Sequence, residues 1–214
     1  MRSRRFLATG VLLLTMLTGG CFSVAGLHTA RPIEPGSFQI GAAFGAVARD
    51  LSSLGDATPT TEFQLRYGLS ERVDIGLQLL DVSTLFRGRL NGVSLDVNCA
   101  LWLGEDMALA IDPTIEAYEF GRYYWLPLLW DFYESEDLTL TAALRPGWFE
   151  LTYGDGDQGR ILTDFDIDSH LIGVGLMAKW RVAAGLSLVP EVRYVFAEDT
   201  YGLDFVTFSL GLLH

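Results

Sequence analysis

The sequence is poor in cysteine and in basic residues. It contains only two cysteines, Cys21 and Cys99, so a single bridge between them is the one disulfide open to the chain. No cysteine and histidine spacing typical of zinc sites occurs. The 15 basic residues face 27 acidic ones, which gives a formal net charge of −12. This charge repels nucleic acid at long range, and nucleic-acid binding is not expected.

Long apolar runs are also missing beyond the N-terminus. A transmembrane helix needs about 20 consecutive apolar residues, and no such run follows residue 20. Yet hydrophobic residues make up 50% of the chain and aromatic residues 12%, with 23 glycines. The apolar residues must therefore be spread by alternation, which is the pattern of β-strands.

The first twenty residues have the pattern of an export signal. Three arginines precede an apolar stretch over 6–17, which is too short to span a membrane as a helix. Leu17-Thr18-Gly19-Gly20 before Cys21 resembles the lipobox of bacterial lipoproteins, although Thr18 stands where leucine is usual. The resemblance implies a lipoprotein-type signal peptide over 1–20, lipidation of Cys21, and an N-terminal tether over 21–36. An ordinary signal peptide cut near Ala25 or Ala30 is the alternative.

From residue 37 onward the hydrophobic pattern has a period of two. Phe38, Ile40 and Phe44 alternate with small or polar residues, and the pattern resumes after short turns or longer loops. It predicts ten strands, over 37–46, 60–69, 73–79, 93–103, 107–120, 123–133, 138–153, 170–182, 186–197 and 203–213.

These strands predict an all-β domain over 37–214. Short links near Glu71, Glu105, Ser135 and Ala184 alternate with mostly longer ones, as in an outer-membrane barrel. We therefore expect a single antiparallel up-and-down meander β-barrel of about ten strands, with a range of about 8 to 12. An even number places both termini at the short-turn, periplasmic end.

Charged residues alternate with the apolar ones and are expected inside the barrel. Buried charges persist only when paired, so a network of acidic and basic side chains is predicted in the lumen. Its members are Glu62, Arg66, Asp96, Glu116, Arg145, Lys179, Glu191 and Arg193. Aromatic girdles are expected from Phe120, Tyr123 and Tyr124 at one end and Trp130, Phe132 and Trp180 at the other. Barrels of about eight strands are filled by side chains, so ten strands predict a narrow or plugged lumen.

The hairpin over 66–76, with the sequence RYGLSERVDIG, looks like a turn of poorly characterised bacterial outer-membrane β-barrel families. The resemblance implies a place in the Gram-negative outer membrane, with the N-terminus on the periplasmic side. The expected partners are outer-membrane lipid and the barrel-assembly and lipoprotein-sorting machineries. One departure is the C-terminus, Leu212-Leu213-His214, where such barrels usually end in an aromatic residue.

Two functions of different classes follow. The first is an outer-membrane β-barrel lipoprotein, a structural component or narrow, porin-like pore without enzymatic activity. The second is a lipid-tethered soluble periplasmic barrel or sandwich that binds a ligand or a protein partner, with its charged face in water. Asp168-Ser169-His170 at the predicted outer end leaves a residual case for a hydrolase or acyltransferase.

No cofactor is expected apart from the lipid on Cys21. The loop after the seventh strand carries five carboxylates of the kind that calcium takes, and a solvated acidic loop is the simpler interpretation. They are Asp155, Asp157, Asp164, Asp166 and Asp168. Cys99 lies between Val97 and Leu101 on an apolar face, which predicts a packed or lipid-facing thiol.

Overall fold

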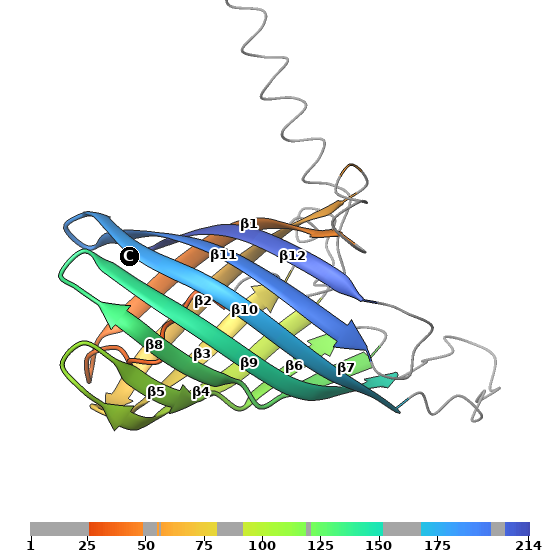
Figure 1. The fold of residues 1–214 in the computed structure, drawn as a ribbon, viewed down its shortest axis with the longest axis horizontal. Helices are drawn as coiled ribbons and strands as arrows, with labels where there is room; N and C mark the ends of the chain where they lie inside the picture. The colour runs from red at the N-terminus through yellow and green to blue at the C-terminus, as the bar shows by residue number, and fades with distance from the viewer. Residues whose placement is uncertain are drawn as a thin grey trace, which may run out of the picture.

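The computed structural model describes residues 26–48, 55, 57–80, 92–118, 121–151, 168–197 and 204–214. They form twelve β-strands in one sheet (Figure 1). No helix among the described residues is long and apolar enough to cross a membrane. The strands are β1 (Phe38–Ala48), β2 (Thr58–Ser70), β3 (Val73–Leu80), β4 (Gly92–Leu103), β5 (Ala108–Ile111), β6 (Thr114–Tyr118), β7 (Gly121–Trp125), β8 (Leu128–Glu134), β9 (Leu138–Leu151), β10 (Asp168–Ala183), β11 (Leu186–Ala197) and β12 (Phe205–Leu213).

The sheet closes into an antiparallel barrel. β5 and β6 both pair with β4, on its two halves, and β8 and β7 both pair with β9. Each of these two pairs is therefore one barrel strand with a break in the middle. Counted in this way there are ten barrel strands, each next to its neighbour in sequence, and β12 returns to pair with β1. The predicted up-and-down meander barrel is confirmed.

The two breaks fall at prolines that the period-two pattern does not register. Pro113 separates β5 from β6, and Pro127 separates β7 from β8. Proline has no N–H to donate to the ladder. Flanking backbone bonds hold the strands together at this level: Asp112 N donates to Pro127 O at 2.9 Å, and Leu126 N donates to Pro146 O at 2.8 Å.

The two ends of the barrel differ. Links at one end, called here the short-turn end, span 71–72, 104–107, 135–137 and 184–185, while those at the long-loop end span 49–57, 81–91, 119–120, 152–167 and 198–204. β1 begins and β12 ends at the short-turn end, where His214 N donates to Ile40 O at 2.8 Å (Figure 1). The predicted alternation of short turns and longer loops is present, apart from the two-residue link at 119–120.

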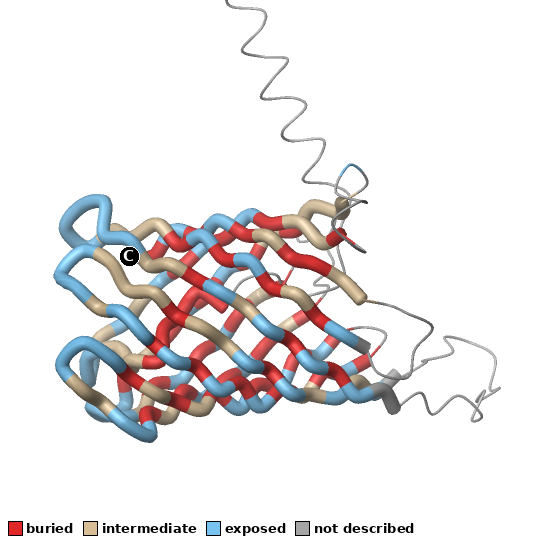
Figure 2. The backbone as a smooth tube through the Cα atoms, in the orientation of Figure 1, coloured by how far each residue is buried: buried red, intermediate tan, exposed pale blue. Residues whose placement is uncertain are grey.

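Burial alternates along the strands, as Figure 2 shows in red and pale blue. The outward positions carry large apolar side chains, such as Leu95 at 59% exposure and Leu176 at 57%. Trp130, Phe132 and Trp180 also point outward. The inward positions carry the polar and charged residues. This is the reverse of the polarity of a soluble barrel.

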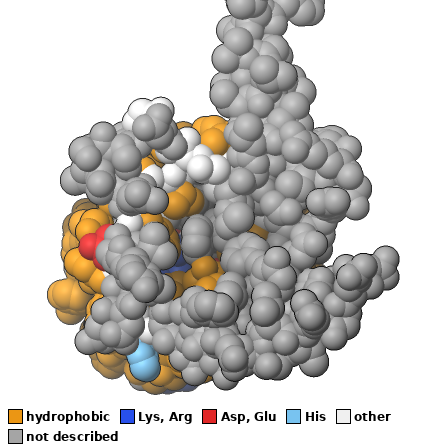
Figure 3. All heavy atoms as spheres, turned by 90° about the vertical axis from the view of Figure 1, so that its right-hand side faces the viewer, with side chains coloured by type: hydrophobic (Ala, Val, Ile, Leu, Met, Phe, Trp, Pro, Cys, Tyr) orange, Lys and Arg blue, Asp and Glu red, His pale blue; other side chains and the backbone are white. Residues whose placement is uncertain are grey.

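The interior near the long-loop end contains an apolar cluster of Leu80, Tyr118, Tyr123, Trp125, Leu171 and Val195. Tyr123 is only 4% exposed, so its predicted place in an outer aromatic girdle is wrong. It stacks on Phe149 with ring centroids 4.3 Å apart, because its strand position faces inward. Figure 3 looks onto this end, and most of the described side chains visible there are hydrophobic.

Residues 26–37, called here the plug, precede β1 and turn into the barrel. Pro35-Gly36 forms a β-turn in which Ser37 N donates to Glu34 O at 3.0 Å and Gly36 has a φ of 78°. Proline and glycine at these two positions are typical of a type II turn. Residues 26–30 are all buried. Of the predicted 21–36 tether, residues 26–30 therefore lie within the lumen, while Glu34, Pro35 and Gly36 are exposed.

Candidate functional site in the barrel lumen

The plug follows the barrel axis from the middle of the lumen to the short-turn end. At mid-height, Gln64 Nε2 donates to Gly26 O at 3.4 Å. Toward the short turns, Arg31 forms an ion pair with Glu134, and its NH2 group donates to Gly104 O at 2.8 Å. The plug therefore contacts several barrel strands at successive heights.

Leu27 packs against the wall where the wall has no side chain. A Cβ atom at Gly211 would lie 2.1 Å from Leu27 Cδ2, and one at Gly41 would lie 3.3 Å from Leu27 Cδ1. Leu27 has a φ of 51°, a left-handed conformation that costs a non-glycine residue about 1–2 kcal/mol. The surrounding packing, with Leu27 completely buried, offsets this cost.

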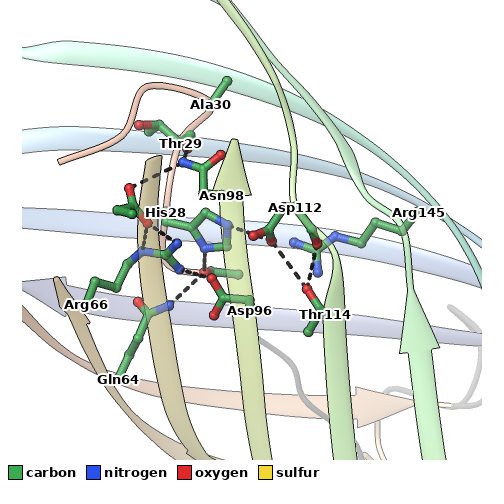
Figure 4. A network of polar contacts seen from close by, with 12 residues as sticks. His28, Thr29, Ala30, Gln64, Arg66, Asp96, Asn98, Asp112, Thr114 and Arg145 are labelled. Carbon is green, nitrogen blue, oxygen red and sulfur yellow. Dashed lines mark hydrogen bonds and ion pairs between the residues drawn. The ribbon is translucent and has the colours of Figure 1, made fainter. Parts of the chain in front are cut away.

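His28 connects the plug to the broken barrel strand (Figure 4). Its Nε2 atom lies 2.8 Å from Asp112 Oδ2, and its Nδ1 atom faces Gly26 O. Both partners only accept hydrogen bonds, so both contacts are satisfied when the ring carries two protons. Burial and Arg66 lower the pKa of His28, but Asp112 and Asp96 outweigh them, and the net pKa is raised from its ordinary value.

Arg66 lies at the centre of the polar network and is completely buried. Its Nε donates to Asp74 Oδ1 at 2.9 Å, and its NH1 lies 2.6 Å from Asp96 Oδ1. Asp74 in turn accepts a bond from Ile33 N at 3.0 Å. A buried guanidinium is tolerated when carboxylates surround it, and here one of these carboxylates also binds the plug.

Asp131 fixes the next part of the plug. Its two carboxylate oxygens accept bonds from Ala30 N at 2.9 Å and from Arg31 N at 3.0 Å. Thr141 Oγ1 donates to the same carboxylate at 2.6 Å. Hydrogen bonds to an ionised acceptor are among the stronger ones in proteins, so Asp131 holds two consecutive plug amides against the wall.

Glu191 binds the first described residue of the plug. Its Oε2 accepts a bond from Gly26 N at 2.5 Å, and its Oε1 accepts one from Arg193 NH2 at 2.9 Å. Arg145 NH2 lies 3.8 Å from the same Oε1. A second polar centre, two arginines around one carboxylate, therefore lies beside Gly26.

The structure places seven of the eight predicted luminal charges in buried positions. Lys179 is the exception; it is half-buried and lines a cavity of about 500 Å³ at the short-turn end, together with Glu134, Glu136 and Arg181. The period-two pattern does not single out His28 or Asp131 as site residues. Gly41 and Gly211 face inward and leave room for Leu27 of the plug, a role that the local sequence does not reveal.

A small void lies beside the plug in the middle of the lumen. A void of about 10 Å³ lies beside His28, Arg145 and Glu191, which is about the space of one water molecule. Residues 26–30 of the plug are buried at this level, among the buried charges of the wall.

His28, Asp96 and Asp112 also place ligand atoms within 4.8 Å of one another, as a metal site would. Arg66 NH1 lies 2.6 Å from Asp96, so the guanidinium already supplies positive charge there. A cation would have to compete with it, and the ion-paired network accounts for the cluster.

Several predicted residues lie outside the described part of the chain. They are Cys21, Phe120, Asp155, Asp157, Asp164 and Asp166. Asp168 begins β10, where it is in register with Glu150, but neither its side chain nor that of Ser169 is described, and His170 is exposed. Cys99 is a free, half-buried cysteine on β4.

No protein-family model and no curated protein sequence matches the chain. Among solved structures, an outer-membrane channel from Pseudomonas putida F1 is similar with a TM-score of 0.50 and 12% identity, over 90% of this chain and 100% of that one. The NanC porin has a TM-score of 0.47 and 10% identity, over 81% and 98%. The outer-membrane protease OmpT from Escherichia coli has a TM-score of 0.45 and 9% identity, over 86% of this chain and 99% of that one. At these identities the likeness to the Pseudomonas channel concerns the fold, a closed antiparallel β-barrel.

Proposed function

We propose that the protein is an outer-membrane β-barrel whose narrow pore is held closed by its own N-terminal plug. The observation that carries the proposal is the polarity of the wall, which is apolar outside and charged inside. The closure of the pore rests on the plug, which lies in the lumen and is held there by polar contacts.

The outward face supports insertion into a bilayer. Each of the ten barrel strands carries a large apolar side chain that is more than a third exposed: Phe44, Phe63, Leu77, Leu95, Ile115, Trp130, Leu144, Leu176, Val192 and Leu210. Burial of each such side chain is worth about 1.5–3 kcal/mol. A barrel with no unpaired edge is also the only form in which β-strands cross lipid. Both features favour the membrane over water.

The second function expected from the sequence, a tethered soluble domain, needs the opposite polarity. It requires the apolar face inside and the charged face in water, whereas Glu62, Arg66 and Asp96 are buried in the lumen. We therefore propose the membrane barrel in its place.

The nature of the plug favours a pore over a purely structural barrel. A permanently filled interior needs no separate segment, and side chains alone fill barrels of about eight strands. Here Asp74, Asp131 and Glu191 hold the plug by hydrogen bonds to its backbone. Release of the plug would leave a lumen lined by charged groups, which suits a small polar solute or ion.

In this proposal the short-turn end faces the periplasm, as in other barrels of this type. The barrel-assembly machinery and outer-membrane lipid are then its partners, and the luminal residues have a gating rather than a catalytic role. The lipoprotein-sorting machinery would be a partner only if Cys21 is lipidated.

Heat-modifiable gel mobility tests the membrane barrel. Protein extracted from outer membranes in cold detergent should migrate as a compact band and shift on boiling, because a closed barrel stays folded in detergent. A mature chain that dissolves without detergent and shows no shift would contradict the proposal.

A further inference from the structure

We propose that the mature chain begins at Gly26 and that its α-ammonium group is held inside the barrel by Glu191. A signal-peptide-cleaving protease would hydrolyse the bond between Ala25 and Gly26. Water supplies the second oxygen of the new Ala25 carboxylate, and its two protons pass to the nitrogen of Gly26, which keeps its own proton and becomes an α-ammonium group. The plug would then be the N-terminus of the protein itself.

The contact between Gly26 and Glu191 suits a charged group. Gly26 N lies 2.5 Å from Glu191 Oε2, and charge-assisted hydrogen bonds are the shorter ones in proteins. Gly26 is buried in the full chain, so the new amine would lie inside the barrel, next to Glu191. An α-ammonium group carries three donors, whereas an amide nitrogen carries one.

The charge of the lumen favours an additional cation. Within the described segments, seven acidic residues and three arginines are buried, with His28 as a fourth cation when it is protonated. A charged amine at Gly26 therefore reduces an excess of buried negative charge. The acidic residues are Glu62, Asp74, Asp96, Asp112, Glu116, Asp131 and Glu191.

The residue at position 26 also fits a close approach. A Cβ atom there would lie 2.5 Å from Arg145 NH2 and 3.3 Å from Glu191 Oε2. Only glycine brings its nitrogen this close to the carboxylate without moving the arginine.

The sequence before Gly26 is suited to cleavage. Ser23 and Ala25 occupy the positions three and one before the proposed cut, and small residues at these positions are typical of an ordinary signal-peptide site. The apolar segment over 6–17 lies upstream of these two residues, in the order that such a signal has.

A lipid on Cys21 fits the docked plug poorly. Gly26 bonds Gln64, which lies six residues from each end of β2, so either barrel end is about 15 Å away at ~3.3 Å per residue and ~40° tilt. The five steps from Cys21 to Gly26 span about 17 Å when fully extended. The chain would barely reach the rim, and the lipid would still have to pass over the wall into the membrane.

The N-terminus of the full-length protein extracted from outer membranes tests the cleavage. We expect N-terminal sequencing to give Gly26-Leu27-His28, and the intact mass to match an unmodified chain from Gly26. A lipid-modified Cys21, or a chain that begins after Ala30, would overturn the inference. Neither result would affect the proposal of a membrane barrel, because that proposal rests on the apolar outward face of the wall.

Amine labelling tests the docking. Lys179 is the only lysine in the sequence, so a Lys179→Arg variant has a single amine, at its N-terminus. In that variant an acylating reagent should modify the amine in unfolded protein and leave it largely unmodified in the folded barrel. Equal labelling of both states would show that the amine is not held in the lumen.

A second substitution tests whether Glu191 is the partner of the N-terminal amine. Glu191→Gln should raise the labelling rate of the folded barrel on the order of tenfold, because one charged hydrogen-bond partner is lost. Glu150→Gln, at an exposed carboxylate on β9, is the matched control and should leave the rate unchanged. Equal rates in the two variants would remove Glu191 from the proposal.

Discussion

The imidazole of His28 lies 2.8 Å from the carboxylate of Asp112, across 84 positions of sequence. Asp112 immediately precedes Pro113, at the break between β5 and β6, where the ladder lacks a donor. The interrupted strand thus carries a carboxylate that binds the plug. Plug and wall share one buried network, and its disruption should open the lumen.

Replacement of His28 by alanine should release the plug. The change leaves Asp112 buried without its cation, and the loss of one partner of a buried pair costs about 3–5 kcal/mol. Maleimide labelling of a cysteine at Thr29, which is buried, reports release in a background that lacks Cys21 and Cys99. Labelling should be fast with His28→Ala and slow with the control His214→Ala, at an exposed residue.

The closed state should depend on pH through His28. Its pKa in the folded state is raised by Asp112 and Asp96, against the effects of burial and Arg66. Protonated His28 therefore stabilises the docked plug. This stabilisation is complete at pH values below the ordinary histidine pKa of about 6.5, and it is lost as the pH rises through the higher pKa of His28 in the folded protein. Open probability in bilayers should therefore increase at alkaline pH, and His28→Gln should abolish this dependence.

Addition of one methyl group at Gly211 should displace the plug. A Cβ atom there would lie 2.1 Å from Leu27 Cδ2, and overpacking typically costs about 1–3 kcal/mol. Gly211→Ala should therefore accelerate maleimide labelling at position 29. Leu27→Ala in the same chain should restore slow labelling; if the double variant labels as fast as Gly211→Ala alone, the contact is not what holds the plug.

Asp131 should contribute more to the stability of the folded barrel than an exposed carboxylate does. Asp131→Ala removes the acceptor of two plug amides and of Thr141, and each hydrogen bond to a charged group is worth about 1.5–3 kcal/mol. Chemical denaturation of the barrel in detergent should show the lost stability. Asp137→Ala, at an exposed turn residue, should change the stability little.

A charge on the outward face should impair insertion. Leu176 lies near the middle of β10 and is 57% exposed, and arginine at the bilayer midplane costs about 2–4 kcal/mol. Leu176→Arg should lower the folded fraction in lipid vesicles, whereas His170→Arg, near the strand end, should have little effect. A soluble barrel would tolerate both substitutions equally.

The sequence predicted the wall well because each strand carries its own signal. Phe63, Leu65 and Tyr67 alternate with Glu62, Gln64 and Arg66, and this local pattern identifies both the strand and its inward face. Tyr123 faces inward although the sequence predicts a girdle position for it, because an aromatic residue fits either a girdle or a packed interior. Its neighbours in the cluster, Leu171 and Val195, are remote in sequence.

The plug left no comparable signal. Residues 26–37 have no periodic pattern, and their partners lie far along the chain, as with Gly26 and Glu191 at a separation of 165 positions. Gly41 and Gly211 interrupt the inward face without any local reason. Their role is apparent only once Leu27 lies between them.

Single-channel recording in planar bilayers tests the gated pore most directly. Wild-type protein should be silent or nearly so at neutral pH, because the plug fills the lumen. A variant with both His28→Ala and Asp131→Ala should conduct steadily. The same current in both proteins, or silence in a variant whose position 29 labels rapidly, would contradict the account.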